Sequence, residues 1–230
     1  MESIGQSAGK IVRSFVFEKL TPELAYVIGV YLGDGNVYAD QHQLRFQMCS
    51  IDKEFPEYVK QCIETFLPSL PEIRQSFFKN VKSPVYVLCF DSTPFGNWLL
   101  KVTGCKGWIP REIPREKNIL TRHFLEGFLD SDGFVRMNND KRKNEKHRFE
   151  AGFGSVYPWV YEFAHLMRLQ GVNVRGPWKF QTRGHKVYVD YRVTVKTLIE
   201  SGFQFHIKRK QQVLEEYKRE QLTIPSETVR

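Results

Sequence analysis

Two short runs of this sequence, far apart in the chain, share one pattern. Residues 26–35 read YVIGVYLGDG and residues 124–133 read FLEGFLDSDG, so each run has a glycine, four further residues and then Asp-Gly. The density of apolar residues predicts a helix, and the Asp-Gly pair predicts where it ends. A chain that repeats this pattern is expected to contain two similar halves.

The segments that follow the two runs recur in the same order. Strands are predicted from the alternation of polar and apolar residues, and helices from a spacing near 3.6 residues. In the first half, strands are expected at 41–48, 72–79 and 85–90, and helices at 52–66 and 94–102. In the second half, strands are expected at 134–137, 148–153, 173–180 and 186–195, and helices at 156–170 and 195–201. The sequence therefore predicts an α+β fold in which an αββαββα unit occurs twice, with a pseudo-twofold relation.

Domain boundaries follow from this repeat. Residues 103–118 carry two prolines and several charges, as is typical of a linker. The predicted parts are an N-terminal segment 1–14, a first half 15–102, the linker 103–118, a second half 119–203 and a charged, helical tail 204–230.

Composition limits the class of protein. The chain has 230 residues, of which 41% are hydrophobic, and a formal net charge of +8, so a globular protein with a polyanionic partner is expected. A basic soluble protein without such a partner has the same composition. The four cysteines lack zinc-ligand spacing, which favours reduced thiols and an intracellular location, in the cytoplasm or an organellar matrix. Neither a secretory signal nor a membrane span is predicted.

Small residues occupy matching positions in the two runs. They are spaced by four residues, Gly29 with Gly33 and Gly127 with Ser131. Residues at this spacing share one helix face, and small side chains there let two helix backbones approach closely. If the two helices pack side by side, their C-terminal ends meet.

Two carboxylates would then lie together, those of Asp34 and Asp132. A carboxylate at a helix C-terminus opposes the helix dipole by about 0.3–1 kcal/mol, and the two charges also repel each other. A shared divalent cation would remove both penalties, and Mg²⁺ is the usual partner of carboxylate and phosphate oxygens. With a basic sheet, this predicts phosphodiester hydrolysis by metal-activated water. Alternatively, each Asp-Gly is only a helix stop.

At this point the residues resemble a known family. VIGVYLGDG at 27–35 and LEGFLDSDG at 125–133 are similar to the two LAGLIDADG motifs of a single-chain LAGLIDADG homing endonuclease. The resemblance covers nearly the whole chain, because the order of elements after each motif also fits. It implies a monomer in which each half presents a saddle of antiparallel strands to the DNA major groove. It also implies that both strands of a long, asymmetric DNA site are cut with Mg²⁺ or Mn²⁺.

The resemblance also implies roles for individual residues. The implied metal ligands are the catalytic carboxylates of Asp34 and Asp132 and the carbonyls of Gly33 and Ser131. Leu32 replaces the earlier aspartate of the first motif, which Asp130 keeps in the second, but that position is not the catalytic one. The candidates for further polar or basic groups beside the scissile phosphates are Gln47, Lys106 and Lys208 or Lys210. The lysines are otherwise surface side chains.

Polar residues of the predicted strands are candidates for reading DNA, because Gln and Arg suit major-groove base edges. Those of the first half are Gln41, Gln43, Arg45, Gln47, Arg74 and Lys79. Those of the second half are Arg148, Lys179, Gln181, Arg183, Lys186, Tyr188 and Arg192. The basic loop 138–147 is expected to grip phosphates, and Trp108 and Trp178 are consistent with core positions. Two other functions stay open: an RNA maturase that binds intron RNA, and a DNA-binding protein without catalysis.

Overall fold

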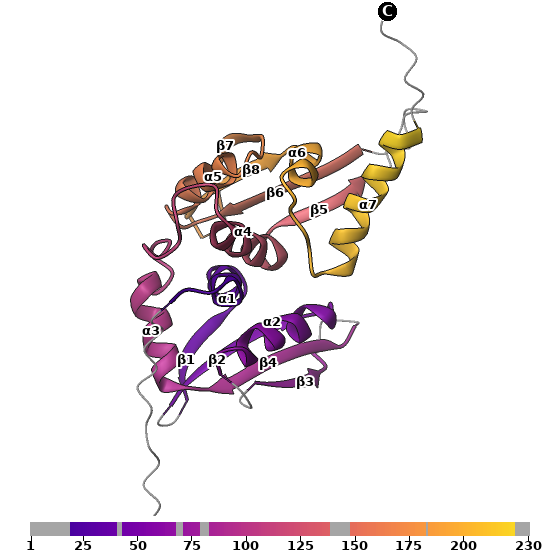
Figure 1. Ribbon diagram of the computed structural model, residues 1–230. Coiled ribbons are helices and arrows are strands. Elements are labelled where there is room, and N and C mark those ends of the chain that lie inside the picture. The colour runs from indigo at the N-terminus through magenta and orange to yellow at the C-terminus, as the bar shows by residue number, and fades with distance from the viewer. Residues whose placement is uncertain are drawn as a thin grey trace, which may run out of the picture.

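The structure is a computed structural model that describes residues 19–40, 43–67, 71–78, 83–138, 148–182 and 184–223. The first half contains α1 (Pro22–Leu32), β1 (Asn36–Asp40), β2 (Gln43–Ser50), α2 (Glu54–Glu64), β3 (Glu72–Ser76), β4 (Val85–Asp91) and α3 (Thr93–Thr103). The second half contains α4 (Ile119–Ser131), β5 (Phe134–Asn138), β6 (Arg148–Ser155), α5 (Val160–Leu169), β7 (Val174–Gln181), β8 (Val187–Val193) and α6 (Val195–Glu200). A further helix, α7 (Lys208–Thr223), follows (Figure 1). The predicted α+β fold with a repeated αββαββα order is confirmed.

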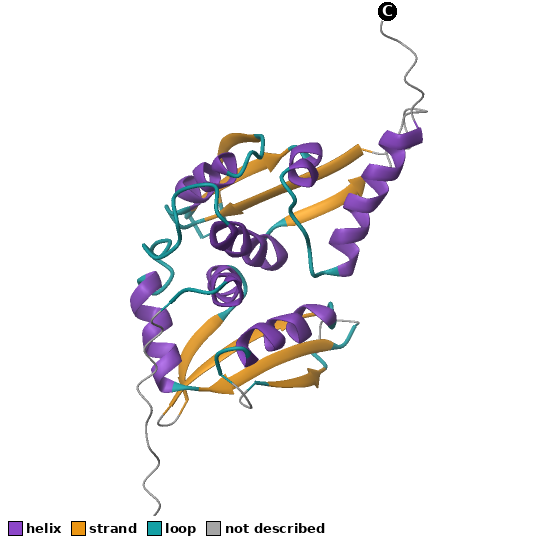
Figure 2. Cartoon of the chain, in the orientation of Figure 1, coloured by secondary structure: helices purple, strands orange, loops and turns teal. Residues whose placement is uncertain are grey.

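The two sheets have the same topology. Their strand orders are β1-β2-β4-β3 and β5-β6-β8-β7, and all neighbouring strands are antiparallel. The motif helices α1 and α4 lie side by side between the two sheets (Figures 1 and 2). The halves are therefore joined through these helices, with one sheet on either side of the pair.

Two differences from the predicted elements are the largest. The first half has a separate strand, β1, directly after its motif, where the sequence predicted only the following strand. Helix α5 begins at Val160 and not at 156, because residues 156–159 form a turn in which the Ser155 hydroxyl accepts a hydrogen bond from the backbone N–H of Tyr157. Neither difference alters the order of the elements.

Both motif helices have well-defined beginnings. The Thr21 hydroxyl accepts a hydrogen bond from the backbone N–H of Leu24, and Pro22 takes the first helical position of α1. The Asn118 side chain accepts one from the N–H of Leu120 at the start of α4. Because the residues of α1 from Leu24 to Leu32 are all buried, this helix lies inside the molecule on every side.

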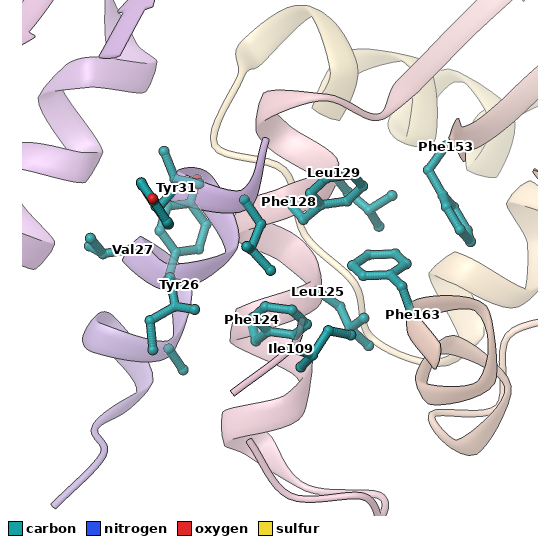
Figure 3. Packing of buried hydrophobic residues seen from close by; sticks show 14 of the residues in the cluster. Tyr26, Val27, Tyr31, Ile109, Phe124, Leu125, Phe128, Leu129, Phe153 and Phe163 are labelled. Carbon is teal, nitrogen blue, oxygen red and sulfur yellow. The ribbon is translucent and has the colours of Figure 1, made fainter. Parts of the chain in front are cut away.

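An aromatic core fixes α4 against the second sheet. The ring centroid of Phe163 on α5 lies 4.6 Å from that of Phe128 on α4 and 4.7 Å from that of Phe153 on β6 (Figure 3). All three side chains are almost fully buried, and each such burial stabilises the fold by roughly 1.5–3 kcal/mol.

In the described part of the chain, no helix is both long and apolar enough to cross a membrane.

Candidate active site and nucleic-acid interface

The motif helices touch through glycines. A Cβ added to Gly29 would lie 2.1 Å from the Phe124 carbonyl oxygen, and one added to Gly127 would lie 2.1 Å from that of Tyr26. No side chain fits at either position, because real Cβ contacts are far longer. The two positions are equivalent in the two halves, so the backbones approach each other symmetrically.

The same close packing continues to the helix ends. A Cβ on Gly33 would lie 2.0 Å from the Ser131 hydroxyl oxygen and 3.2 Å from the Asp132 Cβ. The Ser131 hydroxyl donates to carbonyl oxygens of its own helix, those of Gly127 and Phe128. The structure thus brings together all four predicted interface residues, and Asp34 and Asp132 follow directly at the meeting point.

Both carboxylates have raised pKa values, and the charge of Asp132 contributes to the shift of Asp34. The pKa of Asp34 is raised to about 6, by burial first and then by the charge of Asp132, against the lowering effect of Lys210 and Lys106. Burial also raises the pKa of Asp132, against the lowering effect of the same lysines. Both residues keep exposed surface, but the protein around them displaces much of their solvent. Within the described residues neither carboxylate accepts a hydrogen bond or forms an ion pair, so both oxygen pairs are available to a ligand.

Lys106 sits beside the end of the first motif helix. Its ammonium donates to the Gly33 carbonyl oxygen at 2.8 Å and lies 5.1 Å from the Tyr31 ring centroid. The backbone here is left-handed at Gly104, Cys105 and Lys106, and the Trp159 indole N–H donates to the Lys106 carbonyl. Burial lowers the pKa of Lys106, while Asp34 and Asp132 favour its charged form. The linker therefore delivers one positive charge to the paired acids.

Lys210 occupies the corresponding place in the second half. Only 2% of the residue is exposed, and its ammonium donates to three carbonyl oxygens at 2.7–2.8 Å, those of Leu129, Asp130 and Gly133. These carbonyls lie at the C-terminal end of α4 and just beyond it, so the lysine caps the helix and opposes the negative end of its dipole. Burial lowers the pKa of Lys210 to about 8.

Lys208 lies elsewhere. It is exposed at the start of α7, where its backbone N–H donates to Glu54 Oε1 on α2. Of these two candidate lysines, Lys210 therefore lies beside the acids. Lys208 is exposed, and its role beside the scissile phosphates stays a prediction.

Acids on α4 hold the segment that carries Lys210. The buried Asp130 carboxylate accepts from the Tyr26 hydroxyl at 2.8 Å and from the His206 backbone N–H at 3.0 Å. One turn earlier, Glu126 accepts from the Gln204 N–H at 3.1 Å. The His206 ring stacks on Tyr58 of α2 with 3.5 Å between centroids. Asp130 thus links both motif helices to residues 204–210. This role could not be predicted from the sequence, because the partners of Asp130 are far from it along the chain.

Each sheet has one face covered by a helix and one open face. In the first sheet the open face carries alternate residues of β2, namely Gln43, Arg45, Gln47 and Cys49, while Phe46 and Met48 are buried. The Tyr38 hydroxyl donates to Gln47 Oε1 at 2.7 Å, and Arg45 forms a bidentate pair with Asp91. Burial and the charge of Asp34 raise the pKa of Cys49, so this face adjoins the acids.

The open face of the second sheet is different. Glycines 152 and 154 occupy β6, and a Cβ on Gly154 would lie 2.5 Å from the Tyr188 ring. Tyr188 therefore fills the space above β6, and burial followed by the charge of Asp132 raises its pKa. Trp178 and Phe180 project from β7 with 47% and 52% exposure, so Trp178 is not a core residue.

The donor set fits a hard cation in part. Among the described residues no three His, Cys, Asp or Glu side chains gather at a point that could hold a metal ion. Two carboxylates and the adjacent backbone carbonyls remain, a set that Mg²⁺ commonly completes with water and substrate phosphate oxygens. The arrangement therefore suits a cation that arrives with a phosphate ligand.

Known proteins resemble the chain at two levels. No family model matches it. An uncharacterised protein of Methanocaldococcus jannaschii, MJ0398, is 24% identical over 210 residues, which are 85% of this chain and 71% of that protein.

Solved structures of two homing endonucleases are similar to it. A variant of I-DmoI in complex with its target DNA and manganese has a TM-score of 0.52 at 12% identity, covering 84% of this chain and 97% of that one. A variant of I-SmaMI has a TM-score of 0.52 at 14% identity, covering 89% and 93%. The chain has the duplicated LAGLIDADG fold. At these identities the likeness establishes the fold and not the chemistry.

This fold gives the predicted DNA-reading residues definite places. The open faces of the two sheets carry Gln43, Arg45, Gln47, Arg74, Arg148, Tyr188 and Arg192, and Lys186 is exposed in the turn before β8. Gln41, Lys79, Arg183 and the basic residues of the loop 139–147 lie outside the described residues.

The phase of β7 was predicted wrongly. Lys179 pairs with the buried Val189, and its ammonium lies 5.6 Å from the ring of Tyr161 on α5, so it points to the helix-covered face. Gln181 has the same phase. A register shift between Arg175 and Trp178 moves Trp178 and Phe180 onto the open face instead.

Proposed function

We propose that this protein is a site-specific DNA endonuclease that acts as a monomer and hydrolyses both strands of a long duplex with Mg²⁺ or Mn²⁺. The observation that carries the proposal is the pair of carboxylates Asp34 and Asp132, which have no hydrogen-bond or ion-pair partner among the described residues, at the touching ends of two symmetric helices. A duplex has two strands to cut, and each half of the protein supplies one acid.

The electrostatics of the acids supports a role in binding a cation. Burial raises the pKa of both carboxylates, and the charge of Asp132 adds to the shift of Asp34, so a bound cation would favour their charged forms. The carboxylates of Asp34 and Asp132 and the carbonyls of Gly33 and Ser131 would hold the metal. The chemistry that a bound divalent cation supplies is activation of water and neutralisation of phosphate charge.

The two lysines contribute without being metal ligands. Lys106 and Lys210 each neutralise the negative end of one motif helix, and the charge of each acts on Asp34. A fixed ammonium near a phosphate favours the charge that develops in the transition state, an effect typically worth two to three orders of magnitude in rate, as for other preorganised donors. Gln47, which accepts a hydrogen bond from the Tyr38 hydroxyl on the adjoining open face, would orient water or phosphate.

The DNA partner is supported by charge and by shape. The net charge of +8 suits a polyanion, and the open faces flank the acids on both sides. Structures of I-DmoI variants with a TM-score of 0.50 or more contain target DNA with manganese or magnesium. A duplex lying across both open faces would place its backbone beside Asp34 and Asp132.

The test is linearisation of a plasmid. The plasmid carries the DNA that flanks the insertion containing this gene, with the insertion removed, and is incubated with Mg²⁺ or with EDTA. We expect linear product with Mg²⁺ only, and none from a variant that combines Asp34→Asn and Asp132→Asn but still binds the DNA. Cutting by the double variant would refute the role of the acids. Tight binding without cutting, to that DNA or to the intron RNA, would indicate a regulator or a maturase.

A further inference from the structure

Three aromatic side chains form a patch on the open face of the second sheet, defined here as Trp178, Phe180 and Tyr188. Register places them together, because Phe180 pairs with Tyr188 and Trp178 pairs with Asp190, and cross-strand partners share a face. The ring centroids of Phe180 and Tyr188 are 5.1 Å apart. About half of Trp178 and of Phe180 is exposed.

The fold itself does not require these rings. The core side of β8, the strand that carries Tyr188, is filled by Val189, Tyr191 and Val193, which are at least 93% buried. Large apolar groups on the outer side therefore add exposed apolar surface without adding to the core. Contiguous apolar surface of this kind usually marks a binding site.

The surroundings of the patch are basic on balance, which favours a polyanion as the partner. A cavity of about 560 Å³ adjoins Trp178, and its lining includes Arg136, Arg148, Arg175 and Arg192 together with Glu150, which pairs with Arg136 and Arg148. Arg192 also lies 4.8 Å from the Phe134 ring centroid, on the same face. At the other end of the patch, Tyr188 covers Gly154 beside Asp132. The patch thus lies between basic side chains and the candidate active site, along the path proposed for the duplex.

Among the described residues, the strands of the first half carry no equivalent aromatic patch, although Phe77 and Phe78 are exposed just after β3. The corresponding strands, β3 and β4, present Arg74, Val87 and Cys89 on their open face. Arg74 is paired with Glu72 at 2.7 Å. Aromatic side chains on the strands themselves therefore distinguish the second open face from the first, and they are expected to act mainly on one half of the DNA target.

We propose that this patch reads thymine 5-methyl groups, so that the half-site under β7 and β8 carries thymine at the positions it touches. The major-groove edges of the four bases present hydrogen-bond donors and acceptors, and the thymine methyl is the apolar group among them. Phenyl and indole rings can bury that methyl but offer little to the other bases. This inference rests on the proposed function, because it assumes that duplex DNA occupies the open faces.

The experiment measures binding in EDTA, where cleavage does not interfere. Wild-type protein selects duplexes from a random pool, and the best duplex is remade with deoxyuridine for thymidine in one half at a time. Uracil lacks only the methyl group. We expect the substitution in one half to weaken binding by about fourfold for each methyl that is contacted. The same substitution in the other half should have a smaller effect.

Variants assign that loss to the patch. In Phe180→Ala and Trp178→Ala, replacing thymine with uracil should weaken DNA binding less than it does in wild type, because the thymine methyl has lost its aromatic contact. Phe180→Leu should keep the preference for thymine, since it keeps an apolar group. Tyr161→Ala is the matched control, an exposed aromatic of the second half on the helix-covered side. Circular dichroism of each variant verifies folding.

The outcomes are separable. Uracil tolerated in both halves, or a uracil effect equal in wild type and in both alanine variants, would overturn the thymine inference while leaving the endonuclease proposal intact. Failure of wild-type protein to select any duplex would overturn both. A thymine preference that disappears with Phe180 and Trp178, and persists in Tyr161→Ala, would support it.

Discussion

The two halves of this molecule agree where the chemistry is proposed and differ where the target is read. Gly29 and Gly127 make equivalent backbone contacts, and each motif helix ends in an acid with a lysine beside it. The open faces, in contrast, share almost nothing: one is polar around Gln47, and the other is aromatic around Phe180. A duplex explains this difference, because its two backbones are chemically alike while its base sequence need not be symmetric.

The helix ends themselves are only approximately symmetric. Lys106 reaches the end of α1 from a left-handed turn in the linker and makes one hydrogen bond to the helix. Lys210 is buried and makes three at the end of α4. The position of Asp130 is taken by Leu32 in the first half. The second half thus carries the additional task of anchoring residues 204–210.

The strongest test of symmetry is at the helix interface. Gly29→Ala and Gly127→Ala should each lower the free energy of unfolding by about 3 kcal/mol or more, because each Cβ would meet a backbone carbonyl at 2.1 Å. Denaturant unfolding measures both. Gly184→Ala is the control, since nothing lies within 4 Å of its Cβ. A loss below about 1 kcal/mol in either half would show that the helices do not pack this closely.

Substitution of Lys106 and of Lys210 should lower stability by different amounts and lower cleavage activity by similar amounts. Lys210→Met leaves three carbonyls without a donor and should lower the free energy of unfolding by about 2–3 kcal/mol, whereas Lys106→Met should lower it by about 1 kcal/mol. Both should reduce cleavage about a hundredfold. Thermal unfolding and single-turnover cleavage measure the two effects, with Lys218→Met, at an exposed position of α7, as the control. Equal stability losses would contradict the asymmetric capping.

In the absence of metal, the two acids should make the stability of the protein depend on pH. The folded-state pKa of Asp34, about 6, lies above its ordinary value of 3.8, so the protonated form is favoured by folding. Its contribution to stability is present below about pH 4 and is lost as the pH rises through 6. Asp34→Asn should therefore raise the Tm in EDTA by about 2–4 °C at pH 7.5 and leave it unchanged near pH 4. Asp132→Asn should act in the same direction, and a Tm that falls at pH 7.5 would refute this account.

The smallest expected effects concern phosphate contacts. Arg74→Gln on the first open face and Arg148→Gln on the second should each weaken DNA binding a few-fold, whatever the sequence. Each should also reduce the slope of log K against log salt concentration by about 1. Binding titrations at several salt concentrations measure both slopes. A slope unchanged in one variant would remove that half's arginine from the DNA interface.

The sequence was sufficient for the features that repeat. Local sequence pattern predicted both motif helices, the proximity of Asp34 and Asp132, and the order of elements. Each of these features depends on a pattern that occurs twice in the chain. Lys106 was found from its place in the linker. Such features depend on neighbours in sequence or on the repeat itself.

The remaining features depend on contacts between distant segments. A buried, helix-capping lysine such as Lys210 has no local signature that separates it from the exposed Lys208. Asp130 meets His206 only after the chain has folded around α2 and α4. The register shift in β7 reverses the faces of Lys179 and Phe180, since a one-residue change of phase moves every following side chain to the other face.

The central claim is that each half supplies one indispensable acid to double-strand cleavage. The most direct test uses a target duplex with a different label on each strand, Mg²⁺, and a denaturing gel that resolves the two products. Wild type and a Glu64→Gln control should cut both strands. Asp34→Asn and Asp132→Asn should each bind the duplex and fail to make the double-strand break. Undiminished cutting of both strands by either single variant would contradict the account.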